Sequence, residues 1–392
     1  MTTGRLAPHL SGLGTTIFAE MSALAVSTGS INLGQGFPDV DGPDAIAEEA
    51  VAAIREGRGN QYPPGQGVPE LLAAVAAHQQ RWYGITLDPS EEVLVTAGAT
   101  EAIAAAMLAL VDEGDEVVAL EPYYDCYRAA IMLARGRPVP VRLEPPHFRL
   151  DEQRLRDAIS DRTRVIMLNS PHNPTGAVLD RAELDAIARV AIEHDLVVVS
   201  DEVYEHLCFD SPHIPITTLP GMRERTVTIS SAGKTFSFTG WKVGWVTGPG
   251  DLVTAVRTTK QFLTFVSSGP FQYAMAYALD QQMAWVEGLR ESLADRRDLL
   301  TSGLTTIGFD AHRPRGTYFV TTDVRPLGWD SAEAFCRQLP DRAGVVAVPC
   351  AVFYDSPGAA EQALVRWTFS KQEHVLKDAL DRLSSADLTP RR

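Results

Sequence analysis

Side chains of catalytic types follow three short apolar segments in the middle of the chain. Asn173, Asp201 and Tyr204 come after two of these segments, and Lys234 follows the third. Because the carboxyl ends of parallel strands meet at one edge of a sheet, where such sheets bind ligands, we expect these residues to lie together. A lysine that is partly desolvated beside another cation, such as Lys242, has a lowered pKa and can attack a carbonyl to form a Schiff base.

Two phosphate-binding motifs are excluded by glycine spacing. The Gly-Lys-Thr at residues 233–235 would need a glycine five positions earlier to form a nucleotide-hydrolysing loop, and the chain has Thr228 there. The Gly-x-Gly pairs at residues 34–36 and 65–67 lack the third glycine of a dinucleotide-binding turn. The sequence therefore argues against a nucleotide hydrolase and against a dinucleotide-binding enzyme.

Three motifs together resemble the signature of a known enzyme family. They are Asn-Pro-Thr-Gly at 173–176, Asp-Glu-Val-Tyr at 201–204 and the stretch SAGKTFSFTGWKVGW at 231–245. The combination is similar to the pyridoxal-phosphate-dependent aminotransferases of fold type I, class I/II, and the resemblance covers residues 32–367. It is nearest to the N-succinyldiaminopimelate aminotransferase and kynurenine/glutamine transaminase branches. The likeness to the first branch is carried by segments that begin at Phe18, Asn60 and Val95.

The resemblance implies pyridoxal 5'-phosphate as cofactor and gives several residues a catalytic role. Lys234 matches the lysine that forms the Schiff base and then moves a proton between the substrate α-carbon and the cofactor. Asp201 matches the carboxylate that keeps the pyridine nitrogen protonated. Asn173 and Tyr204 match the partners of the ring 3-oxygen, and Tyr123 matches the aromatic residue that stacks on the ring.

The cofactor phosphate needs a site rich in amide and cationic groups. Gly98, Ala99 and Thr100 end a predicted strand and open a helix, so that backbone N–H groups and the helix dipole favour an anion. Ser231 and Lys242 match the remaining phosphate ligands of the family. These five residues form the predicted phosphate site.

The resemblance also implies a substrate site and a dimer. Arg366, between two apolar residues of a C-terminal strand, matches the residue that binds the substrate α-carboxylate through two parallel hydrogen bonds. Gly36 lies in a turn that closes over the same carboxylate, Asn173 contributes to substrate binding, and Phe18 matches a position of the side-chain pocket. Tyr62 matches a tyrosine that reaches the phosphate of the neighbouring subunit, which implies a homodimer.

Three further residues bear on the predicted substrate, phosphate site and metal content. Thr100 stands where kynurenine transaminases have an aromatic residue, which argues against a strictly aromatic substrate. We expect the side chain of Glu101 to turn away from the predicted phosphate site. His206 near Cys208 offers two metal ligands, but no third ligand is spaced correctly, so we expect a structural role and no metal.

Apolar runs that alternate with helical patterns predict the fold. Strands are expected at 93–95, 116–120, 164–168, 196–199, 226–229 and 243–246, and helices at 101–111 and 181–194. Continuous apolar strands separated by helices indicate a parallel sheet that is covered on both faces. A helical stretch at 271–304 then leads to shorter strands at 318–322 and 364–369.

We therefore expect an α/β protein of the PLP-transferase fold type I. Its large domain, residues 40–280, holds a mostly parallel central sheet covered by helices. Residues 1–39 and 281–392 form a smaller α+β domain. The first 35 or so residues contain no strand signal, and we expect them to pack on the smaller domain.

Composition and charge exclude several classes of protein. The 392 residues are 45% hydrophobic and 22% charged, as in ordinary globular proteins. Lys and Arg number 35 against 50 Asp and Glu, for a net charge of −15, which argues against nucleic acid or membrane as a partner. The longest apolar run, residues 102–111, is too short to cross a bilayer. No export signal is recognised, and the four dispersed cysteines suggest reduced thiols in the cytoplasm.

The sequence thus predicts a homodimeric aminotransferase that exchanges an amino group between an amino acid and a 2-oxo acid by ping-pong chemistry, most like the N-succinyldiaminopimelate branch. One alternative is a kynurenine/glutamine-type transaminase with cysteine-conjugate β-lyase side activity. Another is a non-catalytic regulatory module with the same fold. The joint presence of Lys234, Asp201 and Arg366 argues against the regulatory module, because a scaffold needs none of them.

Overall fold

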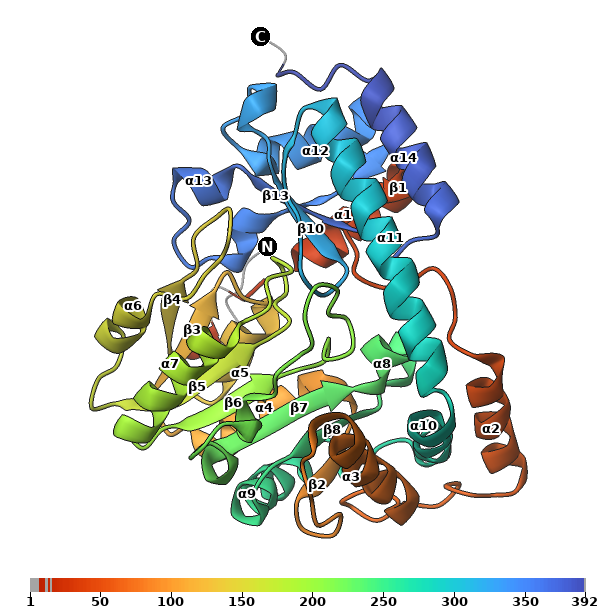
Figure 1. Ribbon diagram of the computed structural model, residues 1–392, viewed down its shortest axis with the longest axis vertical. Coiled ribbons are helices and arrows are strands. Elements are labelled where there is room, and N and C mark those ends of the chain that lie inside the picture. Colours follow the sequence, from red (N-terminus) through yellow and green to blue (C-terminus); the bar gives the residue numbers. More distant parts are fainter. Residues whose placement is uncertain (1–6, 11–12, 15, 391–392) are drawn as a thin grey trace.

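The chain folds around a mixed central sheet that positions the predicted site (Figure 1). The computed structural model describes residues 7–10, 13–14 and 16–390, and within these residues the sheet has seven strands in the order β2-β8-β7-β6-β5-β3-β4. Only β8 runs antiparallel to its neighbours in this sheet. The strands are β2 (Val93–Thr96), β8 (Gly244–Thr247), β7 (Thr226–Ser231), β6 (Val197–Asp201), β5 (Thr163–Asn169), β3 (Glu116–Glu121) and β4 (Arg137–Arg142).

Helices cover both faces of this sheet, as the continuous apolar strands predicted. In β3, Val117 and Ala119 pack on the side of α4, α5 and α9, whereas Val118 and Leu120 pack on the side of α7. The helices α3 and α10 cover the sheet near β2 and β8, and α2 packs on α10. Their bounds are α2 (Asp44–Arg55), α3 (Pro69–Tyr83), α4 (Gly98–Leu110), α5 (Asp125–Leu133), α7 (Arg181–Glu193), α9 (Gly250–Lys260) and α10 (Gly269–Gln281).

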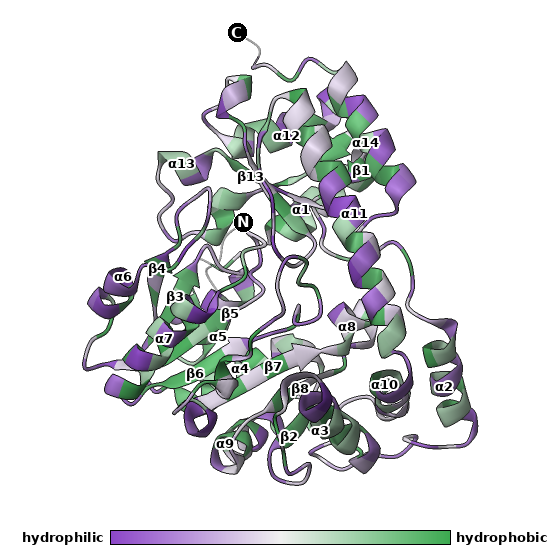
Figure 2. Ribbon diagram, viewed as in Figure 1, coloured by the Kyte–Doolittle hydropathy of each residue, from purple (hydrophilic) through white to green (hydrophobic). Residues whose placement is uncertain are grey.

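All six predicted strands of the central sheet are confirmed, and α4 and α7 correspond to the two predicted helices. The helix α7 begins at a capping box, in which Asp180 and Glu183 each accept from the other's backbone N–H. Figure 2 shows that β3, β5 and β6 are largely apolar, whereas the outlying α6 (Glu152–Asp157) is polar. Apolar periodicity was therefore sufficient to find the strands that are buried on both faces.

The strand β4 was missed by the sequence analysis. It contains Pro138 and Pro140 and lies at the edge of the sheet, where its only paired neighbour in the described part of the chain is β3. A proline has no N–H to donate to a neighbouring strand, and an edge strand tolerates this loss. The two prolines concealed the strand because proline usually signals a break.

A smaller sheet lies above the central one in Figure 1. Among the described residues it has four strands, in the order β12-β13-β10-β9. They are β12 (Val348–Pro349), β13 (Leu364–Thr368), β10 (Phe319–Asp323) and β9 (Asp310–His312). Its core includes residues of α11 (Met283–Ile307), α12 (Ala332–Ala343) and α14 (Glu373–Ser385). The two strands that were predicted for the C-terminal part are confirmed as β10 and β13.

Part of the N-terminal segment packs beside this smaller sheet, as expected, whereas Pro8–Leu10 contact α5 at the central sheet, and residues 1–6, 11–12 and 15 lie outside the described part of the chain. The helix α1 (Ile17–Thr28) contacts α12, and β1 (Ile31–Asn32) pairs in parallel with β11 (Val345–Val346). The first 35 residues gave no strand signal, yet they contain β1, because a two-residue strand leaves no periodic pattern in a sequence. The exact boundaries of the two domains stay a prediction.

The helical stretch predicted at 271–304 is two helices. It breaks at Gln282, between α10 and α11, where the backbone adopts φ −115° and ψ 12°. The helix α11 then runs from α10 to the smaller sheet (Figure 1). The remaining α-helices of the described residues are the short α8 (Ala232–Thr235) and α13 (Ala359–Gln362). Across the described residues, no helix is both long enough and apolar enough to cross a membrane.

Candidate active site

A cavity of about 430 Å³ lies at the carboxyl ends of β5, β6 and β7, within the size range of small-molecule sites. It brings together twelve of the fourteen residues that were predicted for the site. These are Phe18, Gly36, Gly98, Ala99, Thr100, Asn173, Asp201, Tyr204, Ser231, Lys234, Lys242 and Arg366. Tyr62 and Tyr123 are not part of its lining.

Asp201 ends β6 and offers a buried carboxylate to the cavity. The strand register places it beside Asn169, whose amide nitrogen donates to the Asp201 carbonyl over 2.8 Å. The Tyr127 hydroxyl donates to Oδ2 over 2.6 Å, and the Val203 N–H donates to Oδ1 over 3.3 Å. Burial raises the pKa of Asp201 to about 6, against the effect of these hydrogen bonds. A cation in the cavity would therefore be strongly attracted to this carboxylate.

Lys234 follows β7 and reaches the cavity from the short helix α8. Its Nζ donates to the Tyr318 hydroxyl over 3.1 Å and lies 3.5 Å from the Gly36 carbonyl oxygen. Tyr318 in turn donates to the same carbonyl over 2.6 Å. Tyr318 was not predicted from the sequence, because nothing in the spacing of the chain places residue 318 near residue 234.

Arg366 is almost completely buried on β13 and reaches Asn173 from the smaller sheet. Its Nη1 donates to Asn173 Oδ1 over 2.9 Å, and its Nη2 donates to the Gly34 carbonyl over 2.7 Å. Its Nε has no hydrogen-bond partner. The guanidinium lies 4.0 Å from the ring centre of Phe319 and 4.9 Å from that of Phe18. This buried cation has no carboxylate partner among the described residues and can bind an anion.

The turn at Gly36 is closely packed against the ring of Phe319, which lies beside the Arg366 guanidinium. A Cβ atom at Gly36 would lie 2.3 Å from the Phe319 ring, so a larger residue would displace either the turn or the ring. Gly36 therefore allows the N-terminal segment to close over the cavity.

The opposite part of the cavity is suited to an anion. Gly98 has φ +74° at the start of α4, and a Cβ atom there would lie 3.2 Å from the Lys242 Nζ. Lys242 donates to the Thr100 hydroxyl over 3.4 Å, and Ser231 also lines the cavity. Glu101 turns away as expected, and its Oε2 accepts from the Ala97 N–H over 2.6 Å.

Tyr123 does not occupy the predicted position. Its hydroxyl donates to Asp355 over 2.8 Å outside the cavity, whereas the next residue, Tyr124, lines the cavity. Tyr124 is the extended N-cap of α5, and consecutive side chains of an extended segment point in different directions. Tyr127 follows Tyr124 by one helical turn, so both side chains lie on the same face of α5. This spacing could have identified both tyrosines as residues of the cavity lining.

Tyr62 is exposed and lies apart from the cavity of its own chain. Its side chain is 81% exposed, and its ring contacts that of Phe265 at 5.4 Å between centres. Three exposed apolar residues lie close together in the sequence here: Phe262, Leu263 and Phe265. The geometry leaves Tyr62 free to contact another molecule.

Comparisons with known proteins identify the family. The family model "Aminotransferase class I and II" matches residues 28–383. The chain is 52% identical to "Probable N-succinyldiaminopimelate aminotransferase DapC" of Mycobacterium tuberculosis and 40% identical to the methionine aminotransferase of Escherichia coli. Both alignments cover 98% of this chain, with 98% and 99% of the relatives.

The fold comparison agrees with the sequence comparison. The structure of N-succinyldiaminopimelate aminotransferase from Mycobacterium tuberculosis superposes with a TM-score of 0.95 at 52% identity, over 97% of this chain and 99% of that one. The predicted fold and enzyme class are therefore confirmed. The chain belongs to aminotransferase class I and II, a family of pyridoxal-phosphate-dependent enzymes.

Proposed function

We propose that this aminotransferase takes its amino group from N-succinyldiaminopimelate and passes it to a 2-oxo acid in two half-reactions. The proposal of this substrate rests on the 52% identity to the mycobacterial relative over nearly the full length of both chains. The observation that carries the chemistry is the convergence of Lys234, Asp201 and Arg366 on one cavity.

The residues around this cavity fit pyridoxal 5'-phosphate. The buried Asp201 carboxylate suits the protonated pyridine nitrogen, and the backbone of residues 98–100 with Ser231 and Lys242 suits the phosphate. Asn173 and Tyr204 are assigned to the ring 3-oxygen. When bound, this cofactor withdraws electrons from the substrate α-carbon. We assign the stacking position to Tyr124, since Tyr123 lies outside the cavity.

Lys234 is assigned the proton transfer. Its Nζ takes the proton from the substrate α-carbon and delivers it again on the cofactor side. The Tyr318 hydroxyl and the Gly36 carbonyl would hold this amine at the edge of the cavity once substrate has displaced it from the cofactor. A base that is held in place in this way needs little reorganisation when the substrate binds.

Arg366 is assigned the substrate α-carboxylate. Its side chain is fixed by Asn173 and Gly34, and the unpartnered Nε leaves donor capacity for an anion. Two parallel hydrogen bonds from a guanidinium orient a carboxylate as well as bind it. This orientation sets the direction of the α-carbon–hydrogen bond relative to Lys234.

A homodimer would place Tyr62 in the cavity of the partner subunit. Tyr62 is 81% exposed and lies outside the cavity of its own chain, and Phe262 and Phe265 are exposed as well. Large exposed aromatic side chains are typical of association surfaces. We assign the Tyr62 hydroxyl to the phosphate bound by the partner subunit.

A second cavity provides space for a long substrate. It has a volume of about 580 Å³ and shares Thr16, Tyr124 and Asp125 with the first cavity. Arg128 and Arg337 also line it and could bind a distal carboxylate. Each already pairs with an acid, Arg128 with Asp355 over 3.3 Å and Arg337 with Glu333 over 3.0 Å. A distal carboxylate would have to compete with these acids.

The aromatic lining favours a second candidate, a kynurenine/glutamine-type transaminase with cysteine-conjugate β-lyase side activity. Phe18 contacts Tyr124 and Phe353, with ring centres 6.3 and 5.8 Å apart, beside Arg366. Such a surface suits an uncharged side chain. The chain is also 36% identical to the kynurenine–oxoglutarate transaminase of Dictyostelium discoideum.

A substrate panel separates the two candidates. The purified enzyme is supplied with N-succinyldiaminopimelate, kynurenine, glutamine or methionine, together with 2-oxoglutarate, and kcat/KM is measured for each donor. The first candidate requires the highest value for N-succinyldiaminopimelate. A higher value for kynurenine or glutamine would overturn it in favour of the second.

We also propose a cytoplasmic location, because all four cysteines are free thiols.

A further inference from the structure

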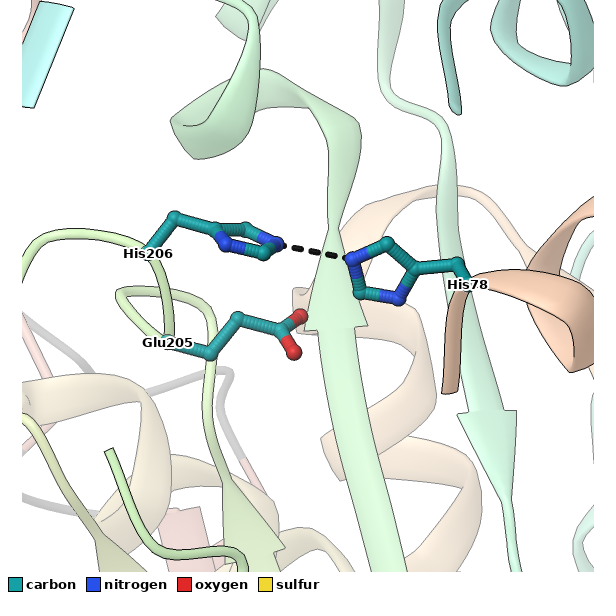
Figure 3. A group of neighbouring side chains, drawn as sticks. All are labelled: His78, Glu205 and His206. Carbon is teal, nitrogen blue, oxygen red and sulfur yellow. Dashed lines mark hydrogen bonds between the residues drawn. The ribbon is translucent and has the colours of Figure 1, made fainter. Parts of the chain in front are cut away.

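Three buried side chains with metal-ligating atoms meet outside the aminotransferase cavity. His78 lies on α3, and Glu205 and His206 follow β6, in the part of the chain after Tyr204. Figure 3 shows the three side chains pointing toward one another. One ligand atom from each lies within 4.8 Å of the other two. Sequence spacing could not reveal this group, because His78 and His206 are 128 residues apart.

The charges of these groups suit a metal cation. Burial lowers the pKa of His78 to about 3 and that of His206 well below its usual value, so both imidazoles are neutral at pH 7. Burial raises the pKa of Glu205 to about 7. A metal ion requires neutral imidazoles and an ionised carboxylate, and it would stabilise the buried carboxylate charge.

We propose that His78, Glu205 and His206 bind a zinc ion through both Nε2 atoms and the carboxylate. This set of two imidazoles and one carboxylate matches the ligands of known three-residue zinc sites, in which water takes the fourth position. The proposal departs from the expectation of no metal, which considered only His206 and Cys208. Neither His78 nor Glu205 had been considered as a ligand from the sequence.

The hydrogen bond between the imidazoles shows what zinc binding would change. The two Nε2 atoms are 2.8 Å apart, so one of them carries a proton and donates to the other. At Zn–N distances of 2.0–2.1 Å, tetrahedral geometry separates two ligand nitrogens by about 3.3 Å. The rings must therefore move apart slightly, and the donating ring must move its proton from Nε2 to Nδ1.

The position of the group separates the zinc from the aminotransferase cavity. Within the described residues, none of the three side chains lines the cavity that contains Lys234. The ion would join α3 to the segment that follows β6, two parts of the chain that are far apart in sequence. Trp82 lies 4.8 Å from His206 between ring centres and is 38% exposed, so the group lies just beneath the surface.

Zinc content is the primary test. The holoenzyme is treated with a chelator, incubated with zinc sulfate, desalted and analysed for metal by mass spectrometry. We expect the wild type to hold one more zinc per chain than His78→Gln. Glu205→Gln should also lose this zinc. Equal zinc contents in the wild type and His78→Gln, or no retained zinc in the wild type, would overturn the proposal and leave the two imidazoles as a hydrogen-bonded pair.

His213→Gln is the matched control. His213 is also buried, and its Nε2 is 2.7 Å from the carboxylate of Glu202, but it is not a member of the group. This variant should keep the zinc. Loss of zinc in His213→Gln as well as in His78→Gln would show that disturbance of this region, rather than loss of a ligand, releases the metal, and would count against the proposal.

A second measurement does not depend on the variants folding. Zinc that binds only the folded state raises the unfolding temperature, so the wild-type holoenzyme should unfold at higher temperature with zinc than without it. Magnesium, which prefers oxygen ligands, should have no such effect. Cobalt in place of zinc should give the visible absorption bands of a four-coordinate site, and octahedral bands or none would overturn the assignment.

Discussion

The Tyr127 hydroxyl donates a hydrogen bond to Asp201 Oδ2 over 2.6 Å, and this bond joins α5 to the end of β6. Both residues are buried and both line the aminotransferase cavity. Burial raises the pKa of Asp201 to about 6, and the bond from Tyr127 is the strongest influence that opposes this rise. Tyr127 therefore helps to keep Asp201 ionised, which its proposed partnership with the pyridine nitrogen requires.

Replacement of Tyr127 by Phe should move the acid side of the activity profile to higher pH. Without the hydrogen bond the pKa of Asp201 rises, so its carboxylate takes up a proton at a pH where the wild type is still ionised. A hydrogen bond to a charged group contributes about 1.5–3 kcal/mol, which corresponds to a shift of roughly one to two pH units. The measurement is kcat/KM as a function of pH.

Tyr123→Phe is the control for this experiment. Tyr123 has the same chemistry and is also buried, but its hydroxyl donates to Asp355 in the second cavity and not to Asp201. Its removal should leave the acid side of the profile in place. A shift of equal size in both variants would mean that α5, rather than the bond to Asp201, controls the titration.

Borohydride reduction should fix the cofactor on Lys234. Lys234 lies in the cavity beside Tyr318, and Lys242 lines the same cavity close to Gly98. Peptide mass spectrometry of the reduced enzyme should find the adduct on the peptide that contains Lys234, and Lys234→Ala should carry none. An adduct on Lys242 in the wild-type enzyme would reverse the proposed roles of the two lysines.

Arg366→Lys should lower kcat/KM for every amino acid and oxo acid by roughly ten- to a thousandfold. The lysine keeps the positive charge but loses the two-point geometry that binds and aligns the α-carboxylate. Affinity for the cofactor, measured by fluorescence titration, should change little. Loss of activity toward one substrate alone would indicate a contact with its side chain instead.

The control for Arg366 is another buried arginine. Arg297 is 3% exposed and pairs with Asp210 over 3.2 Å away from the cavity. Arg297→Lys should lower the temperature of thermal unfolding. Its kcat/KM should stay close to that of the wild type. A fall in kcat/KM for Arg297→Lys as large as that for Arg366→Lys would attribute both effects to disturbed packing.

The sequence revealed those features that depend on local pattern. Buried strands such as β5 and β6 were predicted because each is a continuous apolar run. The polar residues that follow each run mark the carboxyl end of the strand, where such sheets bind ligands. Lys234 and Asp201 were found in the same way. The edge strand β4 was missed because its prolines conceal the pattern. The resemblance gave the stacking position to Tyr123, but Tyr124 lines the cavity, and a sequence does not show in which direction each of two adjacent tyrosines points.

Contacts between distant parts of the chain were beyond the reach of the sequence. Tyr318 lies against Lys234 because the smaller sheet packs over the carboxyl ends of the central strands. His78 meets His206 for a similar reason, since α3 packs near the segment that follows β6. No spacing rule relates residues that only tertiary packing brings together.

Tyr62 should act across the subunit interface, and mixed dimers can show this directly. Lys234→Ala subunits lack the proposed base, and Tyr62→Phe subunits lack the hydroxyl proposed for the partner's phosphate site. In a dimer with one subunit of each kind, one of the two cavities has Lys234 from its own chain and Tyr62 from its partner. Mixing the two variants under conditions that exchange subunits should therefore restore part of the activity. If both residues served the cavity of one chain, neither cavity of the mixed dimer would be complete, and the mixture would show no more activity than the two variants measured separately.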